Sequence, residues 1–252
     1  MGQKCKQCGS AVQPGFKFCN VCGAAVEEPA SEVLSQPEVE PYSELLGVKG
    51  RTVRVLNGEK AGRFVDIYPQ CTIGRKGAGV DISDDPSLSP VHFRIEADET
   101  GANISDEDSL NGVFMRASDK VVLNQNEIIR AGDHYFLYEC FPDDTLSSKF
   151  GADFYASPRR GVRFRLVEIL SGGLRGRACT ASDSITVGRS EGDFVISDDT
   201  RMSAKHFTIR WTQRGGILVD HSDNGTFVQI HHETHAECGD LFFAGQTIFR
   251  LC

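Results

Sequence analysis

Apolar and polar residues alternate along several short stretches of the chain, which is the pattern of a half-buried β-strand. Residues 52–56 and 163–169 show it most clearly, and residues 135–138 and 247–251 read as further strands. Turn-forming residues recur about every 8 to 12 positions between such stretches. With no helical periodicity beside them, these short strands predict an all-β fold of the sandwich or barrel type.

The predicted strands fall into two copies of one unit. A constant offset of 114 positions places Ile73-Gly74-Arg75 over Val187-Gly188-Arg189 and His92 over His206. One deletion later, Asn111-Gly112 falls over Asn224-Gly225, and Ala131-Gly132-Asp133 falls over Cys238-Gly239-Asp240. So long a register is not kept by chance, and the sequence therefore indicates a tandem duplication.

The repeat and the composition shifts around it predict the domain organisation. Two stretches mix acidic residues with Pro and Ser and have few apolar anchors, as linkers do. We expect a zinc ribbon at 1–23, an acidic linker at 24–49, a first β-sandwich at 50–141, a second linker at 142–160 and a second β-sandwich at 161–252.

Composition narrows the classes of function. The formal net charge of −8 argues against general binding to nucleic acid, which needs an excess of Lys and Arg. No apolar run reaches the ~18 to 20 residues of a membrane helix, and no secretory signal follows Met1. We expect a cytoplasmic protein without a membrane partner, whose nine cysteines remain reduced.

Four cysteines near the N-terminus have the spacing of a metal site. Cys5 and Cys8 form one CxxC pair followed by Gly, and Cys19 and Cys22 form a second. Four thiolates complete the tetrahedral shell of Zn²⁺ and leave no position open for catalysis. So short a segment lacks a core of its own, so bound metal would supply its folding energy. The pattern predicts a structural Zn²⁺, with rubredoxin-like iron as the competing interpretation, and it resembles the short zinc ribbons of bacterial proteins.

The polar residues that both repeats share in their loops suit the binding of a phosphate group. Arg75 and Arg189 offer a planar fork of donors, and Ser89 and Ser203 offer a hydroxyl and a backbone N–H. An Asn can hold an extended peptide through its main chain, and positions 111 and 224 supply one in each repeat. Arginines on preformed loops recur in the recognition of phosphorylated motifs.

The three-part series of each repeat resembles the forkhead-associated (FHA) domain. It consists of Gly74-Arg75, Ser89 to His92 and Asn111-Gly112 in the first repeat, and of Gly188-Arg189, Ser203 to His206 and Asn224-Gly225 in the second. The resemblance implies two β-sandwiches that bind phosphothreonine peptides on loops at one end. It further implies that the arginines and serines hold the phosphate, that Asn-Gly holds the peptide, and that Gly74, His92, Gly188 and His206 brace the loops.

Both repeats depart from the pattern of the FHA domain. Val113 stands where Thr usually follows Asn-Gly, and Asp223 places a carboxylate where it would repel phosphate. Around Ser203, however, Arg201 and Lys205 supply positive charge that the first repeat lacks around Ser89. On these grounds we expect the second repeat to be the better binder, with the alternative that one of the two repeats is only a structural spacer.

We therefore expect a non-enzymatic adaptor that binds phosphothreonine proteins in Ser/Thr kinase signalling, either kinase substrates or the kinase itself. The Ser-x-x-His steps lack a nucleophile elbow and a placed acid, which argues against hydrolase chemistry. Two alternatives remain open at this level. One is a phospho-independent protein scaffold, and the other is a zinc-ribbon protein that binds nucleic acid under FHA control.

Overall fold

The computed structural model describes residues 3–4, 11–12, 51–67, 69–118, 120–141 and 161–252. The chain forms two compact units, residues 1–48 and 49–252. In the first unit, β1 (Gln3–Lys4) pairs antiparallel with β2 (Ala11–Val12). Cys5, Cys8, Cys19 and Cys22 lie outside the described residues, so the predicted zinc ribbon stays a prediction.

The second unit is built of strands and one short 3₁₀ turn, η1 (Ser171–Gly173). The first repeat forms β3 (Arg51–Val55), β4 (Phe64–Ile67), β5 (Gln70–Gly74), β6 (Val80–Asp81), β7 (Phe93–Ala97), β8 (Gly101–Asp106), β9 (Val113–Arg116), β10 (Val121–Leu123), β11 (Ile128–Ala131) and β12 (His134–Cys140). The second repeat forms β13 (Phe164–Leu170), β14 (Leu174–Ala181), β15 (Ser184–Gly188), β16 (Phe194–Val195), β17 (Phe207–Thr212), β18 (Gly215–Asp220), β19 (Thr226–Gln229), β20 (Thr234–Glu237), β21 (Leu241–Ala244) and β22 (Thr247–Leu251). The all-β prediction is confirmed, and the described residues contain no helix long and apolar enough to cross a membrane.

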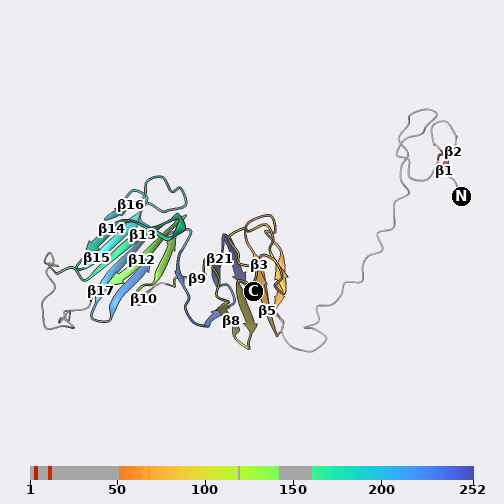
Figure 1. Ribbon diagram of the computed structural model, residues 1–252, viewed down its shortest axis with the longest axis horizontal. Helices are drawn as coiled ribbons and strands as arrows, with labels where there is room; N and C mark the ends of the chain where they lie inside the picture. Colours follow the sequence, from red (N-terminus) through yellow and green to blue (C-terminus); the bar gives the residue numbers. More distant parts are fainter. Residues whose placement is uncertain (1–2, 5–10, 13–50, 68, 119, 142–160) are drawn as a thin grey trace. The chain divides into compact units, whose positions relative to one another are not determined.

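The two repeats exchange their last three strands. One five-stranded sheet runs β20-β8-β7-β5-β6, and the other runs β10-β18-β17-β15-β16. A ten-stranded sheet, β14-β13-β12-β11-β19-β9-β21-β22-β3-β4, spans both sandwiches. In Figure 1, blue β21 accordingly lies beside the orange and olive strands of the first repeat, and green β10 and β12 lie among the strands of the second.

This exchange differs from the expected division into sandwiches at 50–141 and 161–252. Strands β10 to β12 of the first repeat complete the sandwich of the second, and β20 to β22 do the reverse. The chain crosses over at β9 and β19, which pair antiparallel with Met115 opposite Val228. Homologous strands carry the same alternation, so sequence pattern alone cannot tell which repeat completes which sheet.

The strand pairing also corrects one part of the sequence alignment. The turn Gly132-Asp133 joins β11 to β12, and its counterpart is Gly245-Gln246, which joins β21 to β22. Cys238-Gly239-Asp240 instead leads from β20 into β21. The alignment of Ala131-Gly132-Asp133 with Cys238-Gly239-Asp240 is therefore wrong, because the single deletion before Asn224 already accounts for the whole difference.

Each exchanged hairpin carries an aromatic residue into the core of the other repeat. The Phe249 ring lies 5.3 Å from that of Phe93, and both side chains are fully buried. Its counterpart Phe136 lies 5.8 Å from Phe207 and 5.4 Å from Phe194. Edge-to-face contacts of this kind add to the free energy gained by removing the rings from water. Neither core is therefore complete without strands of both repeats.

A buried carboxylate in each repeat holds the turn of the exchanged hairpin. Asp199 Oδ2 accepts the N–H of Asp133 at 2.7 Å. Asp85 Oδ2 accepts the N–H of Gln246 at 2.8 Å and the hydroxyl of Thr247 at 2.7 Å. Each aspartate is the second residue of an acidic pair, Asp84-Asp85 in the first repeat and Asp198-Asp199 in the second, and each joins residues distant in sequence.

Charge favours the exchanged arrangement over an unexchanged one. Glu139 on β12 is only 8 % exposed, and its carboxylate binds Arg165 Nε at 2.5 Å and Arg175 at 3.1 Å. The hydrogen bond from Arg165 is the largest cause that lowers the pKa of Glu139. Glu139 stands opposite Arg165, whereas its counterpart in the second repeat, Cys252, stands opposite Thr52, so Thr52 is the equivalent of Arg165 in the first repeat. Pairing with its own repeat would therefore deprive Glu139 of the Arg165 cation, and a buried carboxylate without a partner is unfavourable.

Candidate phosphate site

The predicted arginines lie at the mouth of each sandwich, directly after a strand that ends in Gly. Arg75 follows β5 and Arg189 follows β15, and both residues are exposed. Their backbone N–H groups donate to the carbonyls of Ser89 and Ser203, both at 2.9 Å, which joins the two loops of each site. No carboxylate of the described residues lies within ion-pair distance of either guanidinium; Arg75 has one long contact, 3.5 Å, to the carbonyl of Pro86.

The glycine before each arginine lies against the backbone of the facing loop. A Cβ at Gly74 would lie 2.1 Å from the carbonyl oxygen of Pro90. A Cβ at Gly188 would lie 2.1 Å from the carbonyl oxygen of Ala204. Only glycine permits this approach, so these two residues position the arginines that follow them.

In each repeat, a buried histidine holds the serine loop and the Asn-Gly loop together from the interior of the sandwich. The Nδ1 atom of His92 accepts the N–H of Ser89 at 2.9 Å, and its Nε2 atom lies 3.1 Å from the carbonyl of Gly112. His206 makes the same contacts with Ser203 at 3.1 Å and Gly225 at 3.3 Å. Because a backbone N–H can only donate, Nδ1 is unprotonated and the neutral imidazole donates from Nε2.

This bracing corrects the expected role of the serine backbone. The N–H groups of Ser89 and Ser203 are occupied by the histidines and are not donors to a phosphate. The hydroxyl oxygens accept the N–H of Leu110 at 3.0 Å and of Asp223 at 3.2 Å. The hydroxyl protons remain to donate outward, so each serine offers one donor.

Stability should therefore fall as the pH is lowered through the histidine range. Burial is the largest cause that lowers the pKa of His92 and of His206 from the ordinary 6.5. The unfolded chain then takes up protons near pH 6.5 while the folded protein takes them up only at lower pH. Stability is thus fully present above that range and is lost between pH 6.5 and the lowered pKa values.

Denaturant unfolding at pH 7.5, 6.5 and 5.5 measures this loss, above the range where most carboxylates titrate. The variant His206→Gln should show a weaker pH dependence than the native chain, although it is less stable at every pH. An exposed histidine, His231, provides the matched control as His231→Gln. An equal pH dependence in both variants would contradict the buried neutral state.

The two asparagines are oriented by the same hydrogen bond in each repeat. Asn111 Nδ2 donates to the carbonyl of Ser87, and Asn224 Nδ2 donates to that of Arg201, both at 2.7 Å. Both asparagines are exposed. Their amide oxygens therefore remain to accept a main-chain N–H of an incoming peptide.

The residue after Asn-Gly does not face a ligand. Thr226 is fully buried, and its hydroxyl donates to Asp220 at 2.8 Å. Its counterpart Val113 is also fully buried and packs in the first core. The departure at Val113 therefore changes the interior of the first repeat and leaves the rim of its phosphate site intact.

The extra cations of the second repeat are arranged differently from the prediction. The Arg201 guanidinium binds Asp133 of the exchanged hairpin at 2.5 Å, which offsets its charge. Lys205 is exposed and directly precedes His206, which agrees with its expected place near the phosphate site. Asp223 and its counterpart Leu110 are both exposed, directly beside the serine hydroxyls. The structure thus weakens the argument that charge favours the second repeat.

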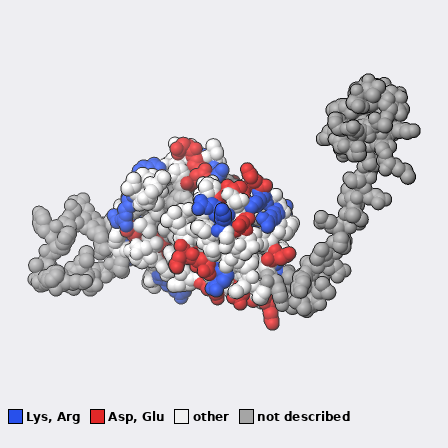
Figure 2. Space-filling view, turned by 45° about the vertical axis from the view of Figure 1, so that its right-hand side comes forward, with Lys and Arg blue, Asp and Glu red and all other residues white. Residues whose placement is uncertain are grey.

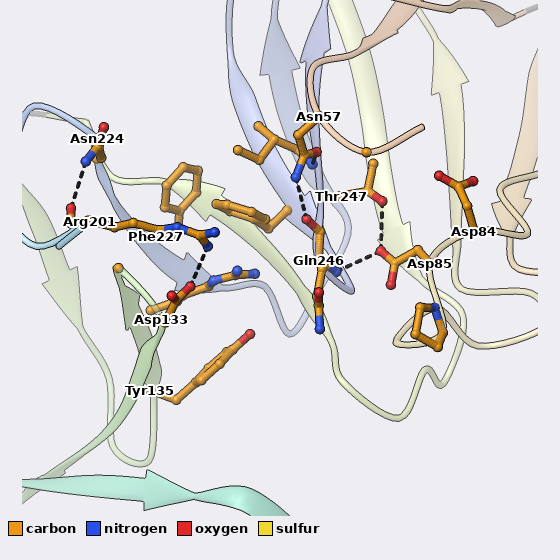
Figure 3. Close-up of a pocket in the computed structure, with 17 residues that line it drawn as sticks. Asn57, Asp84, Asp85, Asp133, Tyr135, Arg201, Asn224, Phe227, Gln246 and Thr247 are labelled. Atoms are coloured by element: carbon orange, nitrogen blue, oxygen red, sulfur yellow. Dashed lines mark hydrogen bonds and ion pairs between the residues drawn. The ribbon is translucent and has the colours of Figure 1, made fainter. Parts of the chain in front are cut away.

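Sequence reasoning missed a groove between the two sandwiches. It has a volume of about 800 Å³. Figure 3 shows Asn224 and Arg201 on one side and Asp84 and Asp85 on the other. Its remaining lining includes Arg130, Tyr135, Phe227 and Phe243. Since these residues come from both repeats, only the exchange of strands brings them together, and no local motif marked them.

The described residues include no cluster of three or more His, Cys, Asp or Glu side chains that could hold a metal. The visible face of the described unit also lacks a broad basic surface, because acidic and basic side chains are interspersed on it (Figure 2). On that face, charge is therefore local, as a site for a single phosphate requires.

Comparison with known proteins finds a similar domain in two segments of the chain. The sequence model of the FHA domain matches residues 71–133 and 185–240, one segment in each repeat. A solved structure from a structural and functional analysis of phosphothreonine-dependent FHA domain interactions is 24 % identical over 37 % of this chain and 98 % of its own. Its TM-score is 0.24. No curated protein matches the chain.

Proposed function

We propose that this protein is a non-enzymatic adaptor whose two FHA segments bind phosphothreonine peptides. The observation that carries the proposal is the pair of exposed arginines, Arg75 and Arg189. Neither has a carboxylate partner among the described residues, and the backbone N–H of each is bonded to the serine of the facing loop. A phosphothreonine carries about −1.5 to −2 charges and three strong acceptors. One arginine, one hydroxyl donor and an asparagine for the main chain form a complementary set.

The proposal extends to the partner class. Phosphothreonine is the product of Ser/Thr kinases, so the partners would be kinase substrates or the kinase itself. A single partner phosphorylated twice could occupy both sites, because a second contact on one chain is intramolecular and raises the apparent affinity. The structural Zn²⁺ of the N-terminal cysteines is a separate prediction from their spacing.

Binding of matched peptides carrying phosphothreonine, phosphoserine or threonine tests the function. We expect the intact chain to bind the phosphothreonine peptide, and the double variant Arg75→Ala, Arg189→Ala to lose about 100-fold in affinity, as removal of charge-assisted hydrogen bonds predicts. Each single variant shows which repeat carries the binding. Fluorescence anisotropy measures these affinities.

Arg214→Ala is the control. Arg214 is exposed in the turn between β17 and β18, whereas Ser203 lies near the opposite end of β17. It should leave the affinity unchanged. Equal binding of phosphorylated and unphosphorylated peptides, retained in the double variant, would contradict the proposal. That result would support the phospho-independent scaffold instead.

A further inference from the structure

The floor of the groove between the sandwiches is the face of the ten-stranded sheet that points away from the cores. Ile129 and Ala131 on β11 are buried in the second core, so Arg130 between them faces the opposite side. On the neighbouring strands, Phe227 stands opposite Arg130, and Tyr135 stands on its other side. Three strands from both repeats thus supply one continuous surface.

Arg130 is a buried cation whose hydrogen-bonding capacity is only partly used. It is 5 % exposed, its guanidinium carbon lies 3.7 Å from the centre of the Phe243 ring, and one terminal nitrogen donates to the Gly245 carbonyl at 3.0 Å. Its Nε is buried and has no hydrogen-bond partner among the described residues. No carboxylate of the described unit forms an ion pair with it. A buried charge without a counterion is unfavourable, so its presence at the groove calls for an explanation.

The other charges that face the groove are already engaged. Arg201 and Asp133 bind one another at 2.5 Å. Asp85 accepts hydrogen bonds from the N–H groups of Ser87 and Gln246 and from the Thr247 hydroxyl. On the far wall, Asp84 accepts the N–H of Glu59 and lies 3.8 Å from the ammonium of Lys60. Of the two arginines that line the groove, Arg201 forms an ion pair and Arg130 forms none with the described residues, so the group complementary to Arg130 is an anion.

The groove is continuous with the phosphate site of the second repeat. Asn224 and Gly225 belong to both, because they form the loop below Ser203 and also line the groove. A peptide whose main chain is held by the amide oxygen of Asn224 lies at the groove's edge.

We propose that the groove holds an anionic side chain of the same phosphopeptide, with its carboxylate or second phosphate at the guanidinium of Arg130. The site would then be composite, with the phosphothreonine held by the second repeat and the neighbouring anion held by an arginine of the first. This inference rests on the proposed function.

The experiment compares phosphothreonine peptides that carry Glu, phosphoserine or Gln at each flanking position in turn. The intact chain is used with Arg75→Ala, so that only the second site reports. At one position, Glu or phosphoserine should increase the affinity about 10-fold over Gln, a ratio that corresponds to one charge-assisted contact. The larger gain tells whether a carboxylate or a phosphate is the natural group.

Two further variants test whether Arg130 is responsible. Arg130→Met should reduce the ratio of the affinities for the Glu and Gln peptides to about 1, while the affinity for the Gln peptide stays the same. Thermal unfolding of this variant reports whether the fold survives. Asp133→Asn changes a residue whose side chain is 57 % exposed, and it should raise the ratio because it frees Arg201. This second variant leaves the backbone hydrogen bond of Asp133 to Asp199 in place.

A ratio near 1 at every position in the parent chain would overturn the inference while leaving the proposed function standing. A ratio unaltered by both variants would overturn it as well. If phosphorylated and unphosphorylated peptides bind equally, the proposed function itself fails, and the composite site fails with it.

Discussion

Phe249→Ala should destabilise the sandwich of the first repeat although Phe249 belongs to the second. The ring is fully buried between Phe93 and Phe242, at centroid distances of 5.3 and 5.1 Å. Removing such a ring from a packed core costs about 3 to 5 kcal/mol. Amide hydrogen exchange measures the effect locally, and protection should fall most in β7 and β8, next to the Arg75 site.

Phe136→Ala is the matched control, because Phe136 occupies the equivalent position in the first repeat. It contacts Phe194 and Phe207, so the loss of protection should appear in β17 and β18, next to the Arg189 site. Each variant should also weaken phosphopeptide binding at the repeat that it does not belong to. The exchange would be contradicted if each variant lowered protection mainly within its own repeat.

Gly74→Ala should abolish the phosphate site of the first repeat without removing any group that contacts the ligand. The added Cβ would lie 2.1 Å from the Pro90 carbonyl oxygen and 2.9 Å from the Val91 Cα, so the two loops must separate. Overpacking against backbone costs about 3 kcal/mol. The movement also breaks the bond from the Arg75 N–H to the Ser89 carbonyl, 2.9 Å long, which sets the spacing of the site.

Gly79→Ala provides the comparison within the same loop. A Cβ there would lie 3.3 Å from the nearest atom, the Thr72 carbonyl oxygen, so a small adjustment accommodates it. Thermal unfolding and phosphopeptide affinity, measured with Arg189→Ala to silence the second site, should fall in Gly74→Ala and change little in Gly79→Ala. Equal behaviour of both variants would show that the close approach of the loops is not needed.

The exchange of strands also links the two phosphate sites energetically. Because each sandwich needs the hairpin of the other repeat, the unfolding of one removes strands from both. A ligand that binds only the folded protein stabilises it by mass action. Phosphopeptide at one repeat should thus stabilise the other repeat too, which two sandwiches on a free linker would not do.

The sequence by itself determined the all-β class, the duplication and the loop residues of each candidate phosphate site. Strand periodicity and turn residues are local signals, and Arg75, Ser89 and Asn111 lie within 37 consecutive positions on adjacent loops of one repeat. The roles of Gly74 and His92 followed from the resemblance to the FHA domain, and the structure shows the close backbone contact and the two ring hydrogen bonds by which they act.

Only the tertiary structure decided which repeat completes which sandwich. The hairpins ending at Cys140 and Leu251 have the same apolar alternation, so either fits either core. The choice depends on contacts between distant residues, such as Glu139 with Arg165 and Asp133 with Arg201. The groove, and in it an Arg130 without an ion pair to the described residues, arise from that choice. A pattern along the chain cannot specify which of two similar partners a strand will meet.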